Sequence, residues 1–154
     1  MDSRGPSPYN PTSNPEQRRS LAEWQMAGAK GAAPRVLLVD DDADLRESLA
    51  KSLMLRSGFE VAMAGDAFEA GYRLATFEPQ VVILDVVMPG MGGLDICERI
   101  RRLTRGRSLK IIILTGYPGI GAQERSLISG ADLFLTKPPD IEALATHVRD
   151  LLEP

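Results

Sequence analysis

Apolar and polar residues follow two different rhythms along the chain. Short apolar runs rich in Val, Ile and Leu recur along the sequence and predict five strands, at about 35–40, 59–64, 81–85, 110–115 and 132–136. The third run opens with Val81 to Leu84 and holds no polar residue before Asp85, which is typical of a strand buried on both faces. The segments between the runs place apolar residues at every third or fourth position, and this spacing predicts helices.

The helices can be placed by the residues that start or stop them. They are expected at about 43–56, from Asp66 to just before Pro79, at about 93–103, at about 120–129, and after Asp140. Gly58 is expected to end the first of them. The apolar residues that these helices carry are, in order, Leu45, Leu49 and Leu53; Phe68, Ala70, Leu74 and Phe77; Leu94, Cys97, Ile100 and Leu103, expected to face inward; Leu127 and Ile128; and Ile141, Leu144, Val148 and Leu151.

Strands that alternate with helices indicate an α/β fold, in which helices cover both faces of a parallel sheet. The natural arrangement is a flavodoxin-like doubly wound (βα)5 domain over residues 35–154, with strand order 2-1-3-4-5. In that order the ligand site lies between the first and third strands, at their carboxyl ends.

Residues 1–34 have a different character. The stretch from Met1 to Pro15 holds four prolines among Ser, Asn and Gly and has almost nothing apolar to bury, so a flexible tail is expected. A short helix over about 16–29, with Leu21, Trp24 and Met26 as its bulky residues, is compatible with the sequence that follows.

Composition excludes several classes of protein. The net charge is −3, from 18 basic and 21 acidic residues, which argues against direct nucleic-acid binding. No apolar run approaches the roughly 20 residues that cross a bilayer, and Cys97, the single cysteine, excludes an internal disulfide. A cytoplasmic protein is the simplest interpretation.

Chemically active side chains gather where the predicted strands end. Asp40, Asp41 and Asp42 follow the first strand, Asp85 ends the third, Thr115 ends the fourth, and Lys137 follows the fifth. Adjacent acids repel one another unless a cation lies between them, and oxygen ligands of this kind suit Mg²⁺. One aspartate suffices as a helix cap, a role for which Asp42 is well placed, so capping leaves Asp40 and Asp41 unexplained. The set predicts a site for a divalent cation and a phosphoryl group.

These motifs, in this order, resemble the receiver domain of two-component response regulators, and the resemblance covers about 35–153. It rests on Val39-Asp40-Asp41-Asp42, Leu84-Asp85-Val86-Val87-Met88-Pro89, Leu114-Thr115-Gly116 and Thr136-Lys137-Pro138. The resemblance implies that Asp85 accepts the phosphoryl group. It further implies that Mg²⁺ is bound by Asp41, Asp85 and the backbone carbonyl of Val87, with Asp40 orienting a bound water.

The resemblance also assigns roles to the remaining strand ends. Lys137, whose side chain a cis Lys137–Pro138 peptide bond would aim inward, would offset negative charge on the phosphoryl group. Thr115 and Phe134 would act as switch residues that change the surface formed by the fourth helix, fifth strand and fifth helix. The implied partners are a histidine kinase or phosphotransfer protein, a downstream protein, and a second copy in a phosphorylation-dependent homodimer. Such a domain catalyses only its own phosphorylation and dephosphorylation.

Two departures from the family pattern bear on these expectations. Met91-Gly92-Gly93 stands where the family often has Met-Asp-Gly, so a helix cap is lost. Val87, two residues after Asp85, cannot hold a water by a side-chain hydrogen bond, and Tyr117, two residues after Thr115, is bulky. Val87 and Tyr117 each predict slow hydrolysis of an aspartyl phosphate.

Two other functions stay open. A phosphatase or phosphotransferase of the haloacid dehalogenase type needs a second aspartate two residues after the nucleophile, where Val87 stands. A flavodoxin-like binding module needs a glycine-rich phosphate loop after the first strand, where three aspartates stand instead.

Overall fold

The central feature of the computed structural model is a five-stranded parallel sheet with order β2-β1-β3-β4-β5, which confirms the predicted α/β topology. The structure describes residues 33–87, 92–104, 108–116 and 119–153. The strands are β1 (Arg35–Val39), β2 (Glu60–Ala64), β3 (Val81–Leu84), β4 (Lys110–Thr115) and β5 (Leu133–Thr136). The helices are α2 (Ala43–Ser57), α3 (Ala67–Phe77), α4 (Gly93–Leu103), α5 (Ala122–Ile128) and α6 (Ile141–Leu152).

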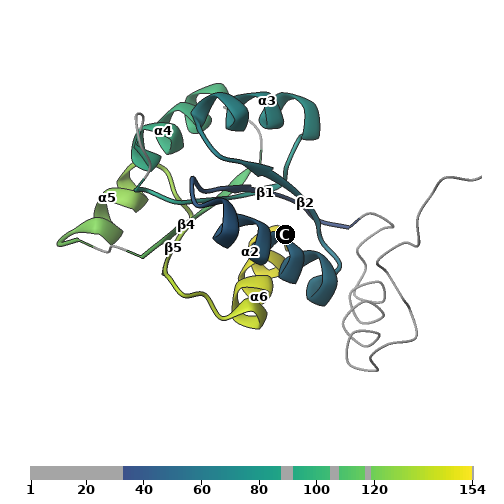
Figure 1. Cartoon of the computed structure of the whole chain (residues 1–154). Helices are drawn as coiled ribbons and strands as arrows, with labels where there is room; N and C mark the ends of the chain where they lie inside the picture. Colours follow the sequence, from purple (N-terminus) through teal and green to yellow (C-terminus); the bar gives the residue numbers. More distant parts are fainter. Residues whose placement is uncertain (1–32, 88–91, 105–107, 117–118, 154) are drawn as a thin grey trace, which may run out of the picture.

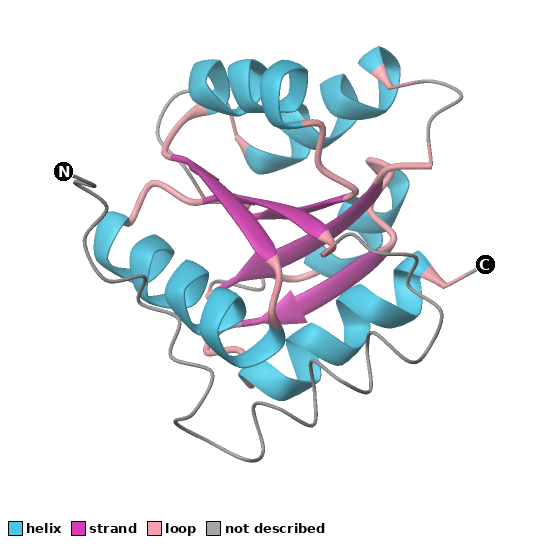
Figure 2. Cartoon of the chain, turned by 90° about the vertical axis from the view of Figure 1, so that its right-hand side faces the viewer, coloured by secondary structure: helices cyan, strands magenta, loops and turns pink. Residues whose placement is uncertain are grey.

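Helices cover both faces of the sheet, with α3 and α4 on one side and α2 and α6 on the other (Figures 1 and 2). Alternate strand residues point to opposite faces, so each of the strands β1, β3 and β4 contributes to two apolar clusters. One cluster joins Leu37, Leu84 and Ile113 to Ile100 of α4. The other joins Leu38, Ile83 and Ile112 to Leu53 and Leu144 of the opposite helices.

Helix ends follow the sequence signals. The side chains of Asp42, Asp66 and Asp140 accept hydrogen bonds from the backbone N–H groups of Leu45, Glu69 and Ala143, as N-caps do. Gly58 ends α2 with φ of 71°, a left-handed conformation that glycine adopts without strain. These caps fix where each helix starts relative to the strand before it.

The expected inward face of α4 was wrong at its last residue. Leu103 is 76% exposed, whereas Thr104 is buried and its hydroxyl donates to the carbonyl of Ile100. The inward positions of α4 therefore run through Cys97 and Ile100 to Thr104, which lies four residues after Ile100 rather than three.

Two other helices place apolar residues in solvent. Phe68 is 89% exposed because it lies on the opposite face of α3 from Ala70 and Leu74. In α5, which is shorter than the predicted 120–129, Ile128 is 84% exposed while Ser126 is buried.

The interpretation of residues 1–34 as a flexible tail with a short helix at 16–29 falls almost entirely outside the described residues. Among the described residues, none of the helices combines the length and apolar character that a bilayer crossing requires.

Candidate functional site

Three carboxylates meet at the carboxyl edge of β1 and β3, as the sequence predicts. Asp40 and Asp41 follow β1, Asp85 follows β3, and one carboxylate oxygen of each lies within 4.8 Å of the others. Asp40 and Asp85 are buried, with 4% and 7% exposure, whereas Asp41 is exposed. The register places Val39 beside Leu84, so the residues that follow these partners emerge side by side.

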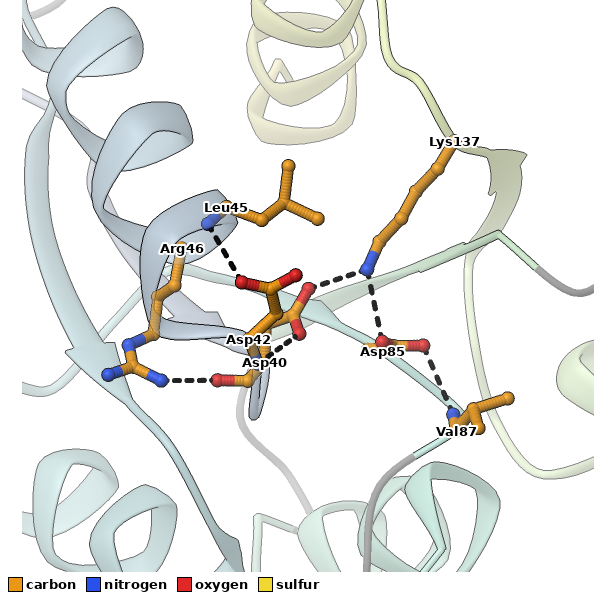
Figure 3. A network of polar contacts seen from close by, with 7 residues as sticks. All are labelled: Asp40, Asp42, Leu45, Arg46, Asp85, Val87 and Lys137. Carbon is orange, nitrogen blue, oxygen red and sulfur yellow. Dashed lines mark hydrogen bonds and ion pairs between the residues drawn. The ribbon is translucent and has the colours of Figure 1, made fainter.

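Lys137 bridges the two buried acids (Figure 3). Its Nζ lies 2.6 Å from Asp40 Oδ2 and 3.0 Å from Asp85 Oδ2. The Lys137–Pro138 peptide is cis, as expected, and the backbone N–H of Lys137 donates to the carbonyl of Thr115 at 2.8 Å. The ammonium group therefore reaches the site from β5 across the end of β4.

The acids around Lys137 keep its side chain protonated. Burial by itself lowers the pKa of a lysine, but hydrogen bonds to Asp40 and Asp85 and the charges of both carboxylates outweigh it, so the pKa of Lys137 lies above its ordinary value. A raised pKa means that this pairing stabilises the fold below the unfolded-state pKa of lysine. The contribution is lost as pH rises through the folded-state pKa. Lys137 is thus an ammonium throughout the neutral range.

The two buried carboxylates are bound in the same way. Asp40 Oδ1 accepts from the N–H of Asp42 at 3.0 Å, and Asp85 Oδ1 accepts from the N–H of Val87 at 3.1 Å. In each acid one oxygen is held by the amide two residues later and the other by Lys137. Both side chains are therefore oriented before any ligand arrives.

Gly93 sets the distance between α4 and Asp85, a role that sequence reasoning missed. Its N–H donates to the carbonyl of Val86 at 3.0 Å. A Cβ at this position would lie 2.1 Å from the carbonyl oxygen of Asp85 and 2.4 Å from Cα of Val86. Only a residue without a side chain fits, and a glycine that opens a helix after a strand-end acid was the available signal. The expected lack of a cap is confirmed, since Gly92 makes no side-chain cap hydrogen bond.

The two predicted switch residues lie on neighbouring strands. Thr115 is fully buried at the end of β4 and pairs in register with Thr136. Phe134 of β5 pairs with Ile113 and packs, half-buried, against the apolar cluster on the α4 side of the sheet.

Cys97 lies in the core and takes no part in the site. Burial raises the pKa of Cys97 to about 11, and its sulfur donates to the carbonyl of Ser129. It is a thiol at neutral pH and a structural residue.

The donor set fits a magnesium ion. Mg²⁺ prefers oxygen ligands, keeps several waters, and is usually held by one or two carboxylates rather than by a closed protein cage. The acid cluster offers such oxygens from two buried residues and one exposed residue, Asp41, which opens the cluster to solvent. The ammonium of Lys137 contacts one carboxylate oxygen of each of the two buried acids.

Comparisons with known proteins point to one family. The model of the response regulator receiver domain matches residues 36–149. Over 118 residues the chain is 40% identical to the response regulator MprA of Mycobacterium sp. (strain KMS), covering 77% of this chain and 50% of that protein. The chain thus spans about half the length of the curated relatives it matches.

Solved structures show the same fold. A response regulator receiver domain from Bermanella marisrubri is 33% identical, with a TM-score of 0.71 over 79% of this chain and 100% of that one. The chemotaxis protein CheY4 of Vibrio cholerae is 29% identical, with a TM-score of 0.72 over the same shares. Neither a phosphatase nor a flavin- or nucleotide-binding module is favoured by these matches.

Proposed function

We propose that Asp85 accepts a phosphoryl group and thereby switches a protein-binding surface. The chain belongs to the response regulator receiver domain family of two-component signalling. The observation that carries the proposal is the shared arrangement of Asp40 and Asp85, each held by Lys137 and by a backbone amide. This arrangement places a buried, oriented carboxylate beside a fixed cation at the ligand edge of the fold.

The transfer can be written in terms of Asp85 and a phosphohistidine donor. A carboxylate oxygen of Asp85 forms a bond to phosphorus as the P–N bond to the imidazole breaks. The imidazole nitrogen keeps the bonding pair and takes up a proton. Lys137 stays protonated and stabilises the charge that develops on the phosphoryl oxygens. In a second transfer, a water oxygen bonds to phosphorus and gives up a proton as the P–O bond to Asp85 breaks, which returns the free carboxylate and inorganic phosphate. The domain thus catalyses only reactions of its own phosphoryl group.

The residues that would hold Mg²⁺ are Asp41 and Asp85 through their carboxylates and Val87 through its backbone carbonyl, with Asp40 orienting a bound water. When bound, the ion would supply positive charge that offsets repulsion between Asp85 and the incoming phosphoryl group. Asp41 is the exposed member of the cluster, which suits a residue that must meet the ion from solvent.

Thr115 and Phe134 carry the switch in this proposal. The Thr115 hydroxyl would bond a new phosphoryl oxygen, and Phe134 would change rotamer on the adjacent strand, shifting the surface of α5, β5 and α6 between two states. A cytoplasmic histidine kinase or phosphotransfer protein would donate the phosphoryl group. A downstream protein, or a second copy in a phosphorylation-dependent homodimer, would bind the altered surface.

The metal requirement tests the site directly. Asp41→Ala removes one of three clustered carboxylates, so we expect most of the Mg²⁺ affinity to be lost while the metal-free fold is retained. Because like charges in the cluster repel, the metal-free variant should be slightly more stable than the wild type. Magnesium titration followed by NMR, beside urea unfolding without metal, measures both. Unchanged Mg²⁺ affinity would exclude Asp41 as a ligand.

Val87 is expected to lengthen the lifetime of the phosphorylated state. Its side chain is 51% exposed beside Asp85 and offers no hydrogen bond to an attacking water. Val87→Asn supplies one, so the phosphoryl group should decay faster than in the wild type. A decay time course in Mg²⁺ compares the two, and equal rates would show that water access is controlled elsewhere. The similar expectation for Tyr117 falls on a residue outside the described ranges.

A further inference from the structure

Arg46 lies on the far side of Asp40 from Lys137 (Figure 3). Its Nη1 donates to the backbone carbonyl of Asp40 at 2.6 Å, and its own backbone N–H donates to the carbonyl of Asp42 at 2.9 Å. The second bond is the ordinary first hydrogen bond of α2, whereas the first ties the Arg46 side chain to the backbone just before Asp41. Hydrogen bonds from a charged donor are stronger than neutral ones, so the side-chain contact is a firm one.

This contact completes the fixation of Asp40. Its N–H donates to the carbonyl of Ala64, and its two carboxylate oxygens accept from Asp42 and Lys137. With Arg46 on the carbonyl, every polar group of Asp40 is bound. The backbone that enters Asp41 is then fixed even though the Asp41 side chain is exposed.

The backbone near the guanidinium of Arg46 leaves space for this group. A Cβ at Gly65 would lie 3.0 Å from Arg46 Nη1, so the absence of a side chain there leaves room for the group. The Nε of Arg46 is buried without a hydrogen-bond partner among the described residues. Leaving a buried donor unpaired is unfavourable, so other interactions of the group must offset that cost.

We propose that Arg46 is a positioning residue of the magnesium site: its side chain holds the carbonyl of Asp40, and with it the backbone that enters Asp41, so that the Asp41 carboxylate faces Asp85. The inference rests on the proposed function, because it concerns the affinity of that site for Mg²⁺. Arg46 does not touch the ion or the phosphoryl group in this account. Its side chain acts through the carbonyl of Asp40.

The direction in which Mg²⁺ affinity changes when Arg46 is removed distinguishes a positioning role from a purely electrostatic one. Arg46 is a cation beside a cation site, so Coulomb repulsion alone predicts that its removal tightens Mg²⁺ binding. Loss of positioning predicts the opposite. Residues that orient metal ligands typically change metal affinity by about 10-fold to 100-fold when they are removed. We expect weakening of that size for Arg46→Met, which keeps the apolar stem and removes the donor.

The experiment is a magnesium titration of the metal-free protein, followed by NMR, for the wild type and Arg46→Met, with urea unfolding measured in the absence of metal. Lys51→Ala is the matched control, since it removes the same unit charge from an exposed position of the same helix. Lys51 lies nine residues beyond the cap Asp42, or about 13 Å along the axis at the rise of a helix. The Mg²⁺ affinity of Lys51→Ala should match that of the wild type.

Weaker Mg²⁺ binding by folded Arg46→Met, with the control unchanged, supports the proposal. Equal or tighter binding overturns it and leaves Arg46 with a purely structural role, seen only in the urea midpoint. Should Arg46→Met not fold, Arg46→Leu, which also lacks a side-chain donor, takes its place under the same two outcomes. If the wild type itself does not bind Mg²⁺, the magnesium site of the proposed function fails and takes this inference with it.

Discussion

Asp85→Asn is expected to abolish incorporation of phosphate from a small acyl phosphate donor. The amide is nearly the same size as the carboxylate, and its oxygen can still accept from Lys137 or Val87, so the fold should persist. An amide oxygen is a poor nucleophile for phosphorus, so no stable acyl phosphate should form. The measurement is base-labile radiolabel on the wild type and the variant after incubation with Mg²⁺.

Asp66→Asn is the matched control for this experiment. It makes the same chemical change just beyond β2, which β1 separates from β3, where Asp66 caps α3 and asparagine caps equally well. This variant should label like the wild type. Label that persists on Asp85→Asn would move the acceptor to another residue.

Gly93→Ala is expected to damage both the fold and the site. The added Cβ would lie 2.1 Å from the carbonyl oxygen of Asp85, and the obstructing atoms belong to the backbone, which cannot swing aside as a flexible side chain can. Either α4 or the end of β3 must shift. Overpacking of this kind costs about 1–3 kcal/mol, and the shift should also slow phosphorylation of Asp85. Urea unfolding and the rate of labelling measure the two effects.

Gly71→Ala gives the opposite expectation and serves as the control. Gly71 lies within α3, and a Cβ there meets nothing within 4 Å. Alanine in a helix is more stable than glycine by about 0.5–1 kcal/mol, so this variant should be more stable than the wild type and label normally. A Gly93→Ala protein as stable as the wild type would show that the contact between α4 and Asp85 is not tight.

The sequence was sufficient for the topology because the central strands β1, β3 and β4 are buried apolar runs, each followed or ended by a predicted site residue. The same logic brought Asp40, Asp41, Asp85 and Lys137 together, since the carboxyl ends of neighbouring parallel strands share one edge. The helix N-caps were equally predictable, because an N-cap is a local hydrogen bond within a few residues.

What the sequence could not supply were contacts that depend on how elements meet in space. The contact of Gly93 with Asp85 depends on the distance between α4 and β3, and that of Arg46 with Asp40 on a side chain reaching back over its own helix start. The exposure of Leu103 likewise depends on packing at the end of α4, where Thr104 is buried instead. Periodicity fixes which face of a helix is apolar, but not how far its neighbours extend.

The central claim is that Asp85 itself carries the phosphoryl group, and reductive trapping tests it most directly. Borohydride reduces an acyl phosphate to an alcohol, so a phosphorylated aspartate becomes homoserine while free carboxylates are unchanged. The wild type, incubated with Mg²⁺ and a small acyl phosphate, is reduced and digested, and the peptides are sequenced by mass spectrometry. We expect homoserine at position 85 and nowhere else, only in samples that contained both Mg²⁺ and donor. Homoserine at another aspartate, or none in a protein shown to be folded and magnesium-bound, would contradict the account.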